Sequence, residues 1–156
     1  MISHRETRIV PYTADLMYAV VSAVEKYPQF LPWVVALRVL SRGENRMTAE
    51  MAVGYGALRE RYVSDVVLDP GARRIAVTQV ENSKGPFKTL ENHWHFTPLA
   101  LADGTGGCEV EFSILFEFRS RLLHSVAGSK FEKVMLKMAD AFEERAKQIK
   151  NGEIAA

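Results

Sequence analysis

The densest cluster of side chains able to do chemistry is formed by Glu91, His93 and His95. In a β-strand, residues two positions apart share a face, so two of these side chains could hold one metal ion. All three could not, because the ends of such a row are ~13 Å apart at ~3.3 Å per residue. The sequence offers no second cluster of ligands, and we expect no metal site.

No nucleophile or phosphate-binding loop stands out elsewhere. Cys108 is the single cysteine, and it has no evident histidine partner that would activate it. The glycine-rich stretch from Gly104 to Gly107 joins two expected strands, whereas a phosphate-binding loop precedes a helix. Nothing in the sequence demands catalysis or a cofactor, so we expect a binding protein and not an enzyme.

Length and composition are those of a single domain. The chain has 156 residues, 47% of them hydrophobic and 25% charged, and we expect one domain over residues 1–156 with a core over about 4–150. A net charge of +1 gives no field that would attract DNA. The charged N-terminus lacks the apolar core of a signal peptide, and no apolar run approaches the ~20 residues of a membrane span. These features predict a cytoplasmic protein whose contact with membrane is peripheral.

Hydrophobic periodicity separates strands from two helical regions. Thr13 is placed to cap the first helix, and the last helix is long and amphipathic, with Gly128 as a point where it could bend or restart. The pattern between residues 34 and 118 is strand-like throughout. The expected elements are strands Glu6–Val10, Met47–Tyr55, Leu58–Leu68, Ile75–Val80, Leu90–Phe96 and Val110–Phe118, and helices Ala14–Val24 and Ser120–Lys150.

This order of elements predicts an α+β fold. Consecutive strands joined by short turns form an antiparallel meander, and its apolar face must be covered. The C-terminal helix is the natural cover, so we expect a curved sheet of about six to seven strands wrapped around it. The wedge between such a sheet and its helix can hold an apolar ligand.

Alternation within the strands predicts an inner face with polar side chains on it. In the strand that starts at Leu58, one alternate set carries three charges and should face water, which turns the other set inward. Because an unpaired buried polar group costs about 1–3 kcal/mol, these side chains either meet a ligand head group, pair with one another, or lie at the wet rim of the sheet. The residues concerned are Glu60, Tyr62, Gln79 and Asn92, and Ser64, Trp94 and Phe96 are expected to share their face.

The segment from Tyr27 to Trp33 is an unusually apolar connector. Pro28 and Pro32 prevent it from forming one regular helix or a central strand, whereas connectors are normally polar and exposed. It is either a hydrophobic plug of the core or a portal that dips into a bilayer interface. The portal candidates are Tyr27, Phe30, Leu31, Pro32 and Trp33.

Four motifs, spread from about Glu6 to Ala146, carry a resemblance to a known family. They are Val10-Pro11-Tyr12, Tyr27-Pro28-Gln29-Phe30-Leu31-Pro32-Trp33, the run from Gly85-Pro86-Phe87 to Phe96, and Ala141-Phe142-Glu143-Glu144-Arg145-Ala146. Together they resemble the coenzyme Q-binding protein family, in the polyketide-cyclase-like branch of the START lipid-transfer superfamily. Since no mitochondrial-type presequence precedes the domain, the chain looks like a bacterial member.

The resemblance implies a helix-grip fold and a cavity for ubiquinone or a related polyprenyl lipid. It also implies a carrier or chaperone that supports respiration and touches the inner membrane transiently. The stripe of Phe131, Met135 and Met138 on the last helix is of a kind that most often forms plain core, although methionine also suits adaptable pockets. The cavity candidates are Met51, Val53, Glu60, Tyr62, Asn92, Trp94, Phe96, Phe112, Ile114, Phe131, Met135 and Met138.

Two alternatives remain open within the same superfamily. A bacterial branch is described as a toxin that blocks association of ribosomal subunits, and the motifs do not separate the branches. A polyketide cyclase-like enzyme is the other alternative, with Glu60 as its one candidate acid or base. The basic residues available to a ribosomal partner, or else forming an ordinary solvated face, are Arg59, Arg61, Lys84 and Lys88.

Overall fold

The structure is a computed structural model that describes residues 1–55, 58–80 and 85–155. The described residues form seven strands, two α-helices and one 3-10 helix. The strands are β1 (Ile2–Val10), β2 (Val34–Gly43), β3 (Arg46–Tyr55), β4 (Leu58–Asp69), β5 (Arg74–Gln79), β6 (Phe87–Ala100) and β7 (Gly106–Phe118). The helices are α1 (Ala14–Ser22), η1 (Val24–Gln29) and α2 (Arg121–Lys150).

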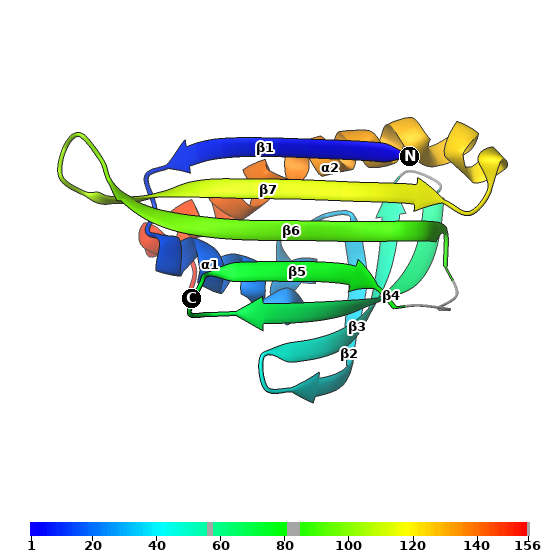
Figure 1. Ribbon diagram of the computed structural model, residues 1–156, viewed down its shortest axis with the longest axis horizontal. Helices are drawn as coiled ribbons and strands as arrows, with labels where there is room; N and C mark the ends of the chain where they lie inside the picture. Colours follow the sequence, from blue (N-terminus) through cyan, green and yellow to red (C-terminus); the bar gives the residue numbers. More distant parts are fainter. Residues whose placement is uncertain (56–57, 81–84, 156) are drawn as a thin grey trace.

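All seven strands belong to one antiparallel sheet, in the order β1-β7-β6-β5-β4-β3-β2 (Figure 1). Strands β2 to β7 are neighbours in sequence as well as in space, as in a meander. Strand β1 instead pairs with β7, from Ile2 opposite Phe116 to Val10 opposite Cys108. The predicted α+β fold is confirmed.

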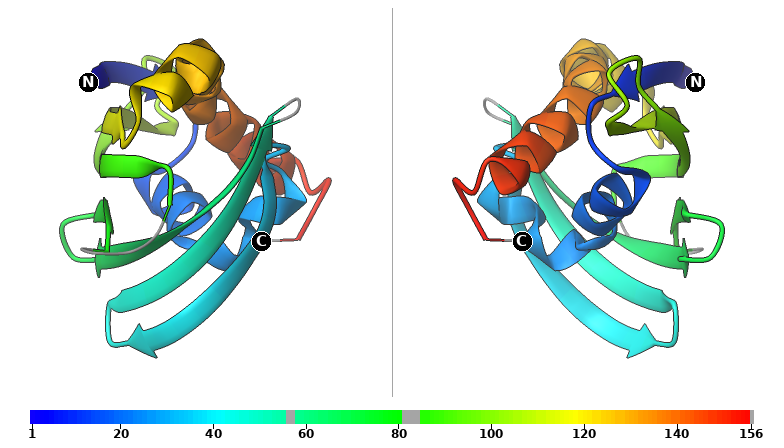
Figure 2. Two further views of the ribbon diagram at one scale, coloured as in Figure 1. Left: turned by 90° about the vertical axis from the view of Figure 1, so that its right-hand side faces the viewer. Right: turned by 90° about the vertical axis from the view of Figure 1, so that its left-hand side faces the viewer.

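The sheet curves around α2, which crosses its concave side (Figure 2). Irregular pairing between β2 and β3, at Val34/Ala36 and Val39/Ser41, adds to this curvature, because a bulge bends a strand and increases its twist. Helices α1 and η1 lie on the same concave side. The sheet, α1 and α2 therefore enclose the apolar interior between them.

Side-chain caps define where both α-helices begin. The Thr13 hydroxyl accepts a hydrogen bond from the Leu16 amide at 3.1 Å, and the Ser120 hydroxyl accepts one from the Leu123 amide at 2.9 Å. Each bond satisfies a backbone donor that has no partner within its helix. Helix α2 is continuous from Arg121 to Lys150. It therefore does not end and restart at Gly128, which was one of the two possibilities expected there.

Several strands are longer than the sequence predicted. Strand β1 starts at Ile2, β6 runs to Ala100, and β7 begins at Gly106, so that Gly106 and Gly107 belong to a strand and not to the predicted loop. Ala100 pairs with Gly106 across β6 and β7. A neighbouring strand supplies hydrogen bonds whatever the side chain is, and this outweighs the weak strand propensity of glycine.

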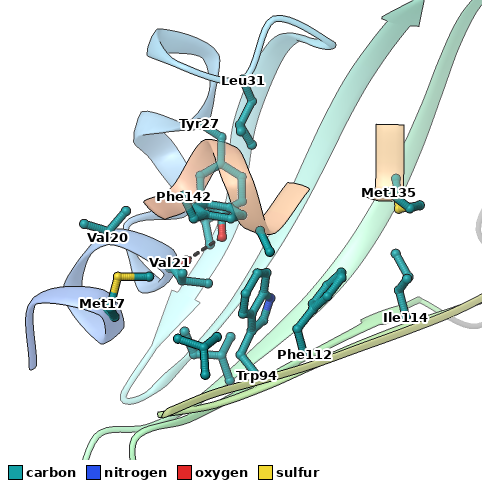
Figure 3. Close-up of a cluster of buried hydrophobic side chains, with 14 of the residues drawn as sticks. Met17, Val20, Val21, Tyr27, Leu31, Trp94, Phe112, Ile114, Met135 and Phe142 are labelled. Carbon is teal, nitrogen blue, oxygen red and sulfur yellow. Dashed lines mark hydrogen bonds between the residues drawn. The ribbon is translucent and has the colours of Figure 1, made fainter. Parts of the chain in front are cut away.

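Two aromatic clusters fill the interior. In the first, the Phe142 ring of α2 lies between Tyr27 of η1 and Trp94 of β6, with centroid distances of 5.1 and 5.2 Å (Figure 3). The Tyr27 hydroxyl donates to the Val21 carbonyl oxygen. The second cluster is formed by Phe87, Phe116, Phe118 and Phe131.

Neither α1 nor α2 combines the length and hydrophobicity needed to cross a bilayer, and the described part of the chain has no other helix that does.

Candidate ligand-binding cavity

A cavity of about 80 Å³ lies between the concave face of the sheet and α2, with side chains of both aromatic clusters in its wall. Its wall combines the connector after η1, inward residues of β3, β4, β6 and β7, and one face of α2. One water requires roughly 10–15 Å³ on this scale, so the space holds about five to eight water-sized spheres. The predicted cavity residues that line it are Met51, Val53, Tyr62, Asn92, Ile114, Phe131, Met135 and Met138.

Polar side chains meet the cavity at one place on the sheet. Ser64 and Tyr62 are two positions apart in β4 and share its inner face. Met51 of β3 stands directly opposite Tyr62 in the ladder, and the Tyr62 hydroxyl donates to the Met51 sulfur at 3.1 Å. Asn92 reaches the cavity from β6.

These polar groups differ in how well they are satisfied. The Asn92 amide nitrogen donates to the Ser113 carbonyl oxygen at 3.0 Å, and its oxygen accepts from the Trp94 indole at 2.9 Å. The Ser64 side chain is only 3% exposed, and among the described residues its hydroxyl has no hydrogen-bond partner. An unpaired buried hydroxyl costs about 1–3 kcal/mol, so the cavity has one polar group for which folding provides no partner.

Burial keeps the phenols in the cavity wall protonated. Removal from water raises the pKa of Tyr62 well above its ordinary value of 10.0, and it does the same for Tyr27. Both hydroxyls are therefore neutral donors at physiological pH. Of the described residues that line the cavity, none carries a carboxylate or an imidazole.

Three predicted cavity residues, Trp94, Phe96 and Phe112, lie elsewhere on the inner face. They are almost fully buried but do not line the cavity. The Trp94 ring packs against Phe112 at 4.5 Å, and Phe96 meets the Tyr18 ring of α1 at 6.4 Å. These three rings pack against one another, against Phe142 of α2 and against Tyr18 of α1, and so they do not border the cavity.

Glu60 is also not part of the cavity wall. It stands opposite Val53 in the ladder and so faces the same side, but it is partly exposed and borders a shallow surface depression. This is the wet rim of the sheet, near the start of β4. Gln79 lies outside the cavity too, and its amide nitrogen donates to the Phe87 carbonyl oxygen at 2.7 Å.

The apolar connector forms part of the cavity wall. Tyr27 and Leu31 are buried and line the cavity, and the half-buried Trp33 lines it as well. Phe30 packs on Phe142 at 5.5 Å, outside the cavity, and Pro32 is exposed. The connector is thus largely covered by the protein's own core, and its role as a portal stays a prediction.

Several cavity residues were not in the predicted set. Strand alternation turns Ser64, as predicted, and also Val66, Val77 and Phe116 to the inner face, and the apolar stripe of the last helix contains Val134 and Phe142. No sequence signal placed Val24 or Val34 against the cavity, because their positions depend on how the connector folds back. The further lining residues are Ala49, Gly54, Phe87 and Leu90.

The predicted basic and metal-binding candidates that the structure describes do not line the cavity. Arg61 is exposed and lies 3.6 Å from Glu50, and Lys84 lies outside the described residues. His93 is exposed, and His95 lies 3.3 Å from Glu111. Within the described ranges, no group of three potential metal ligands comes together.

A curved antiparallel sheet that grips a C-terminal helix around an apolar cavity defines a START-like helix-grip protein. Residues 10–143 match the family described as polyketide cyclase / dehydrase and lipid transport, and the chain belongs to this family.

Relatives and one solved structure support this assignment. Ribosome association toxin RatA of Pseudomonas aeruginosa is 33% identical over 145 residues, 93% of this chain and 95% of that protein. Mitochondrial coenzyme Q-binding protein COQ10 homolog B of Xenopus laevis is 31% identical over 148 residues, 95% of this chain and 59% of that protein. The solution structure of an 18 kDa protein from Caulobacter crescentus shares 35% identity with a TM-score of 0.73, covering 97% of this chain and 99% of that one. The predicted family resemblance is confirmed.

Proposed function

We propose that this protein binds the head group of ubiquinone or a related polyprenyl quinone in the cavity and carries it between membranes or membrane proteins. The observation that carries the proposal is the buried Ser64 hydroxyl, which has no hydrogen-bond partner among the described residues, in a mostly apolar wall. A quinone carbonyl oxygen only accepts hydrogen bonds, and the Ser64 and Tyr62 hydroxyls can donate them. A relative named as a coenzyme Q-binding protein supports the same ligand class.

Transfer of the prenyl tail from a bilayer into this protein is energetically feasible. Each CH₂ group taken out of water contributes about 0.8 kcal/mol, which prevents a bare tail from crossing an aqueous phase. A cavity wall of apolar side chains replaces the hydrocarbon of the bilayer, so the difference between the two environments is small.

The cavity has to widen for such a ligand. Its room for about five to eight waters is far less than a quinone with a polyprenyl tail needs. Met51, Met135 and Met138 stand in the wall, and methionine adapts to irregular shapes because it is unbranched and flexible. We therefore expect these side chains to change rotamer on binding.

The absence of a carboxylate or an imidazole from the described cavity wall supports binding without conversion. Glu60 was the candidate carboxylate for a cyclase reaction, and it lies at the rim. A general acid or base must come within hydrogen-bond reach of the reacting group. We propose that a ligand leaves this cavity chemically unchanged.

The proposal is tested by titrating the protein with a short-chain ubiquinone and following the quenching of Trp33, which lines the cavity. Ser64→Ala should lower affinity about 2- to 10-fold, the range expected for one hydrogen bond. The same change should raise the free energy of unfolding without ligand by about 1 kcal/mol, because it removes an unpaired buried hydroxyl.

The matched control is Ser113→Ala on the outer face of β7, which should change neither affinity nor stability appreciably. Organic extraction of the purified protein, followed by mass spectrometry, identifies any quinone carried from the cell. If no quinone is extracted and none binds in titration, the proposal fails.

We propose ribosome association as a second candidate function. Relatives named ribosome association toxin motivate it. On the protein itself, Arg38 and Arg61 have side chains 72% and 70% exposed, and both lie near Glu50 on the outer face. Exposed arginines of this kind can contact RNA phosphates.

Sedimentation of ribosomal subunits with added protein tests this second candidate. If the candidate holds, the protein shifts the profile toward free subunits, and Arg38→Gln combined with Arg61→Gln weakens the shift. Unchanged subunit joining at saturating protein rejects it and leaves the quinone proposal untouched.

A further inference from the structure

The N-terminal half of α2 carries a surface strip that the cavity does not use. Leu122, Val126, Lys130, Lys133 and Lys137 recur at intervals of three and four residues, which places them on one side of the helix. The cavity residues Phe131, Val134, Met135 and Met138 occupy the opposite side. The strip therefore faces away from the protein's own core.

The strip begins with exposed apolar side chains. Leu122 is 75% exposed and Val126 is 62% exposed. Figure 1 shows the first turns of α2 projecting beyond the end of the sheet. Leu136, 46% exposed, adds a third apolar side chain farther along the same half of the helix.

The charge of this region differs from that of the rest of the chain. Residues 119–137 contain five basic residues and one acidic residue, Glu132, whereas the whole chain has a net charge of only +1. The other 137 residues are therefore net negative. Within the described ranges, no ion pair involves Arg121 or the three lysines of the strip.

This charge does not serve the stability of the helix. The first turn of α2 holds no acidic residue, and Arg121 is its first residue. Cations are disfavoured near a helix N-terminus, where the macrodipole is positive. Basic residues at this end lower the stability of the helix, and sequence features that lower local stability are expected where a surface has a function.

We propose that this strip, Leu122 to Lys137 of α2, docks the protein onto an anionic lipid bilayer. Lysines near an anionic leaflet are attracted by about 1 kcal/mol each, and a helix with basic and apolar side chains on its exposed side lies in the interfacial plane. RNA phosphates would satisfy the lysines but leave Leu122 and Val126 without a favourable environment. The combination of charge and exposed apolar side chains therefore favours a bilayer.

Docking through this strip would hold the cavity close to the membrane. Phe131, Val134 and Met135, which line the cavity, lie between Lys130 and Lys137 on the same turns of the helix. This site differs from the aromatic connector, where two of the five predicted portal residues are buried in the core.

The docking proposal does not rest on the quinone proposal, because vesicle binding is measured without any quinone.

Co-sedimentation with vesicles tests the proposal. The full chain should bind vesicles of phosphatidylcholine with added phosphatidylglycerol and bind pure phosphatidylcholine at least about tenfold more weakly. Lys130→Gln, Lys133→Gln and Lys137→Gln together should reduce binding to anionic vesicles at least about tenfold. Leu122→Ser with Val126→Ser should also reduce it, and circular dichroism verifies that each variant is folded.

The matched control removes the same charge elsewhere, by Lys26→Gln, Lys88→Gln and Lys147→Gln. It should keep most of the vesicle binding. An equal loss in the control, or equal binding to neutral and anionic vesicles, would overturn the proposal. A third result would also overturn it: the lysine triple variant loses ribosome binding, while both strip variants bind vesicles as the parent does. The strip would then be a surface that binds RNA.

Discussion

Tyr62 and Met51 face each other across β4 and β3, and the Tyr62 hydroxyl lies 3.1 Å from the Met51 sulfur in the cavity wall. A thioether is a weak acceptor. A phenol in the wall of an apolar cavity, which normally finds a strong partner, has here only a weak one. A ligand carbonyl would therefore compete easily for this donor.

Tyr62→Phe tests that competition directly. The substitution keeps the ring contact with Phe87 at 5.2 Å and removes only the hydroxyl. We expect the free energy of unfolding to change by less than about 0.5 kcal/mol, because little hydrogen-bond energy is lost. Quinone affinity should fall about 2- to 10-fold in the titration described above. Unchanged affinity would mean that the head group binds elsewhere.

Phe142→Ala should be among the most destabilising single changes in α2. The ring is 1% exposed and contacts Tyr27, Phe30 and Trp94. Its removal should cost about 3–5 kcal/mol by urea denaturation, because the surrounding rings cannot collapse into the space. Leu136→Ala, on an exposed part of the same helix, should cost less than about 0.5 kcal/mol. Similar losses in both variants would contradict the assigned core.

Cys108 should make stability depend on pH at the alkaline end. Burial raises the pKa of its thiol from an ordinary value of 9.0 to about 11. The folded protein thus holds this proton more tightly than the unfolded chain, and its contribution to stability is complete below pH 9 and is lost as pH rises toward 11. The loss at pH 10, relative to pH 8, should be about 1 kcal/mol.

Urea denaturation of Cys108→Ala provides the comparison, since its tyrosines titrate as in the parent chain. The variant should lose less stability between pH 8 and pH 10. If the two proteins lose stability in parallel, the thiol does not titrate in this window.

Arg8 links β1 to α2 through a small network of charges. Its guanidinium lies 2.8 Å from Glu6, 2.8 Å from Asp140 and 3.1 Å from Glu143. Arg8→Gln should lower the free energy of unfolding by about 1 kcal/mol at low salt. The difference should shrink in 1 M NaCl, where the Debye length is ~3 Å.

Arg46→Gln serves as the control for Arg8. The Arg46 side chain is 63% exposed, and among the described residues its one ion pair is with Asp65, so its loss should be close to zero. A larger effect at Arg46 than at Arg8 would show that the network contributes nothing beyond a single exposed pair.

Most of the fold follows from patterns along the chain. Alternation in β6 turns Asn92 and Trp94 inward and His93 outward, because side chains in a strand point to opposite faces. Thr13 and Ser120 indicate where two helices begin, since each offers an oxygen to a free backbone donor. Local chemistry decides these features, so a single sequence is sufficient to predict them.

The cavity does not follow from the same patterns. Alternation turns Phe112 and Ile114 of β7 to the same face, yet only Ile114 meets the cavity. The difference arises because Phe112 packs on Trp94, which in turn packs on Phe142 of α2, an element distant in sequence. Glu60 likewise faces inward by alternation but lies where the sheet extends past its cover.

The sequence by itself thus determined the order of elements, the inner face of each strand and the apolar stripe of α2, because these depend on residues close together in the chain. The tertiary structure alone decided which inward residues pack solidly and which border a cavity. That outcome depends on the curvature of the sheet and on where α1, η1 and α2 rest against it. The tertiary structure also gives the Ser64 hydroxyl no partner among the described residues, since hydrogen bonds across strands depend on which residues the ladder brings together.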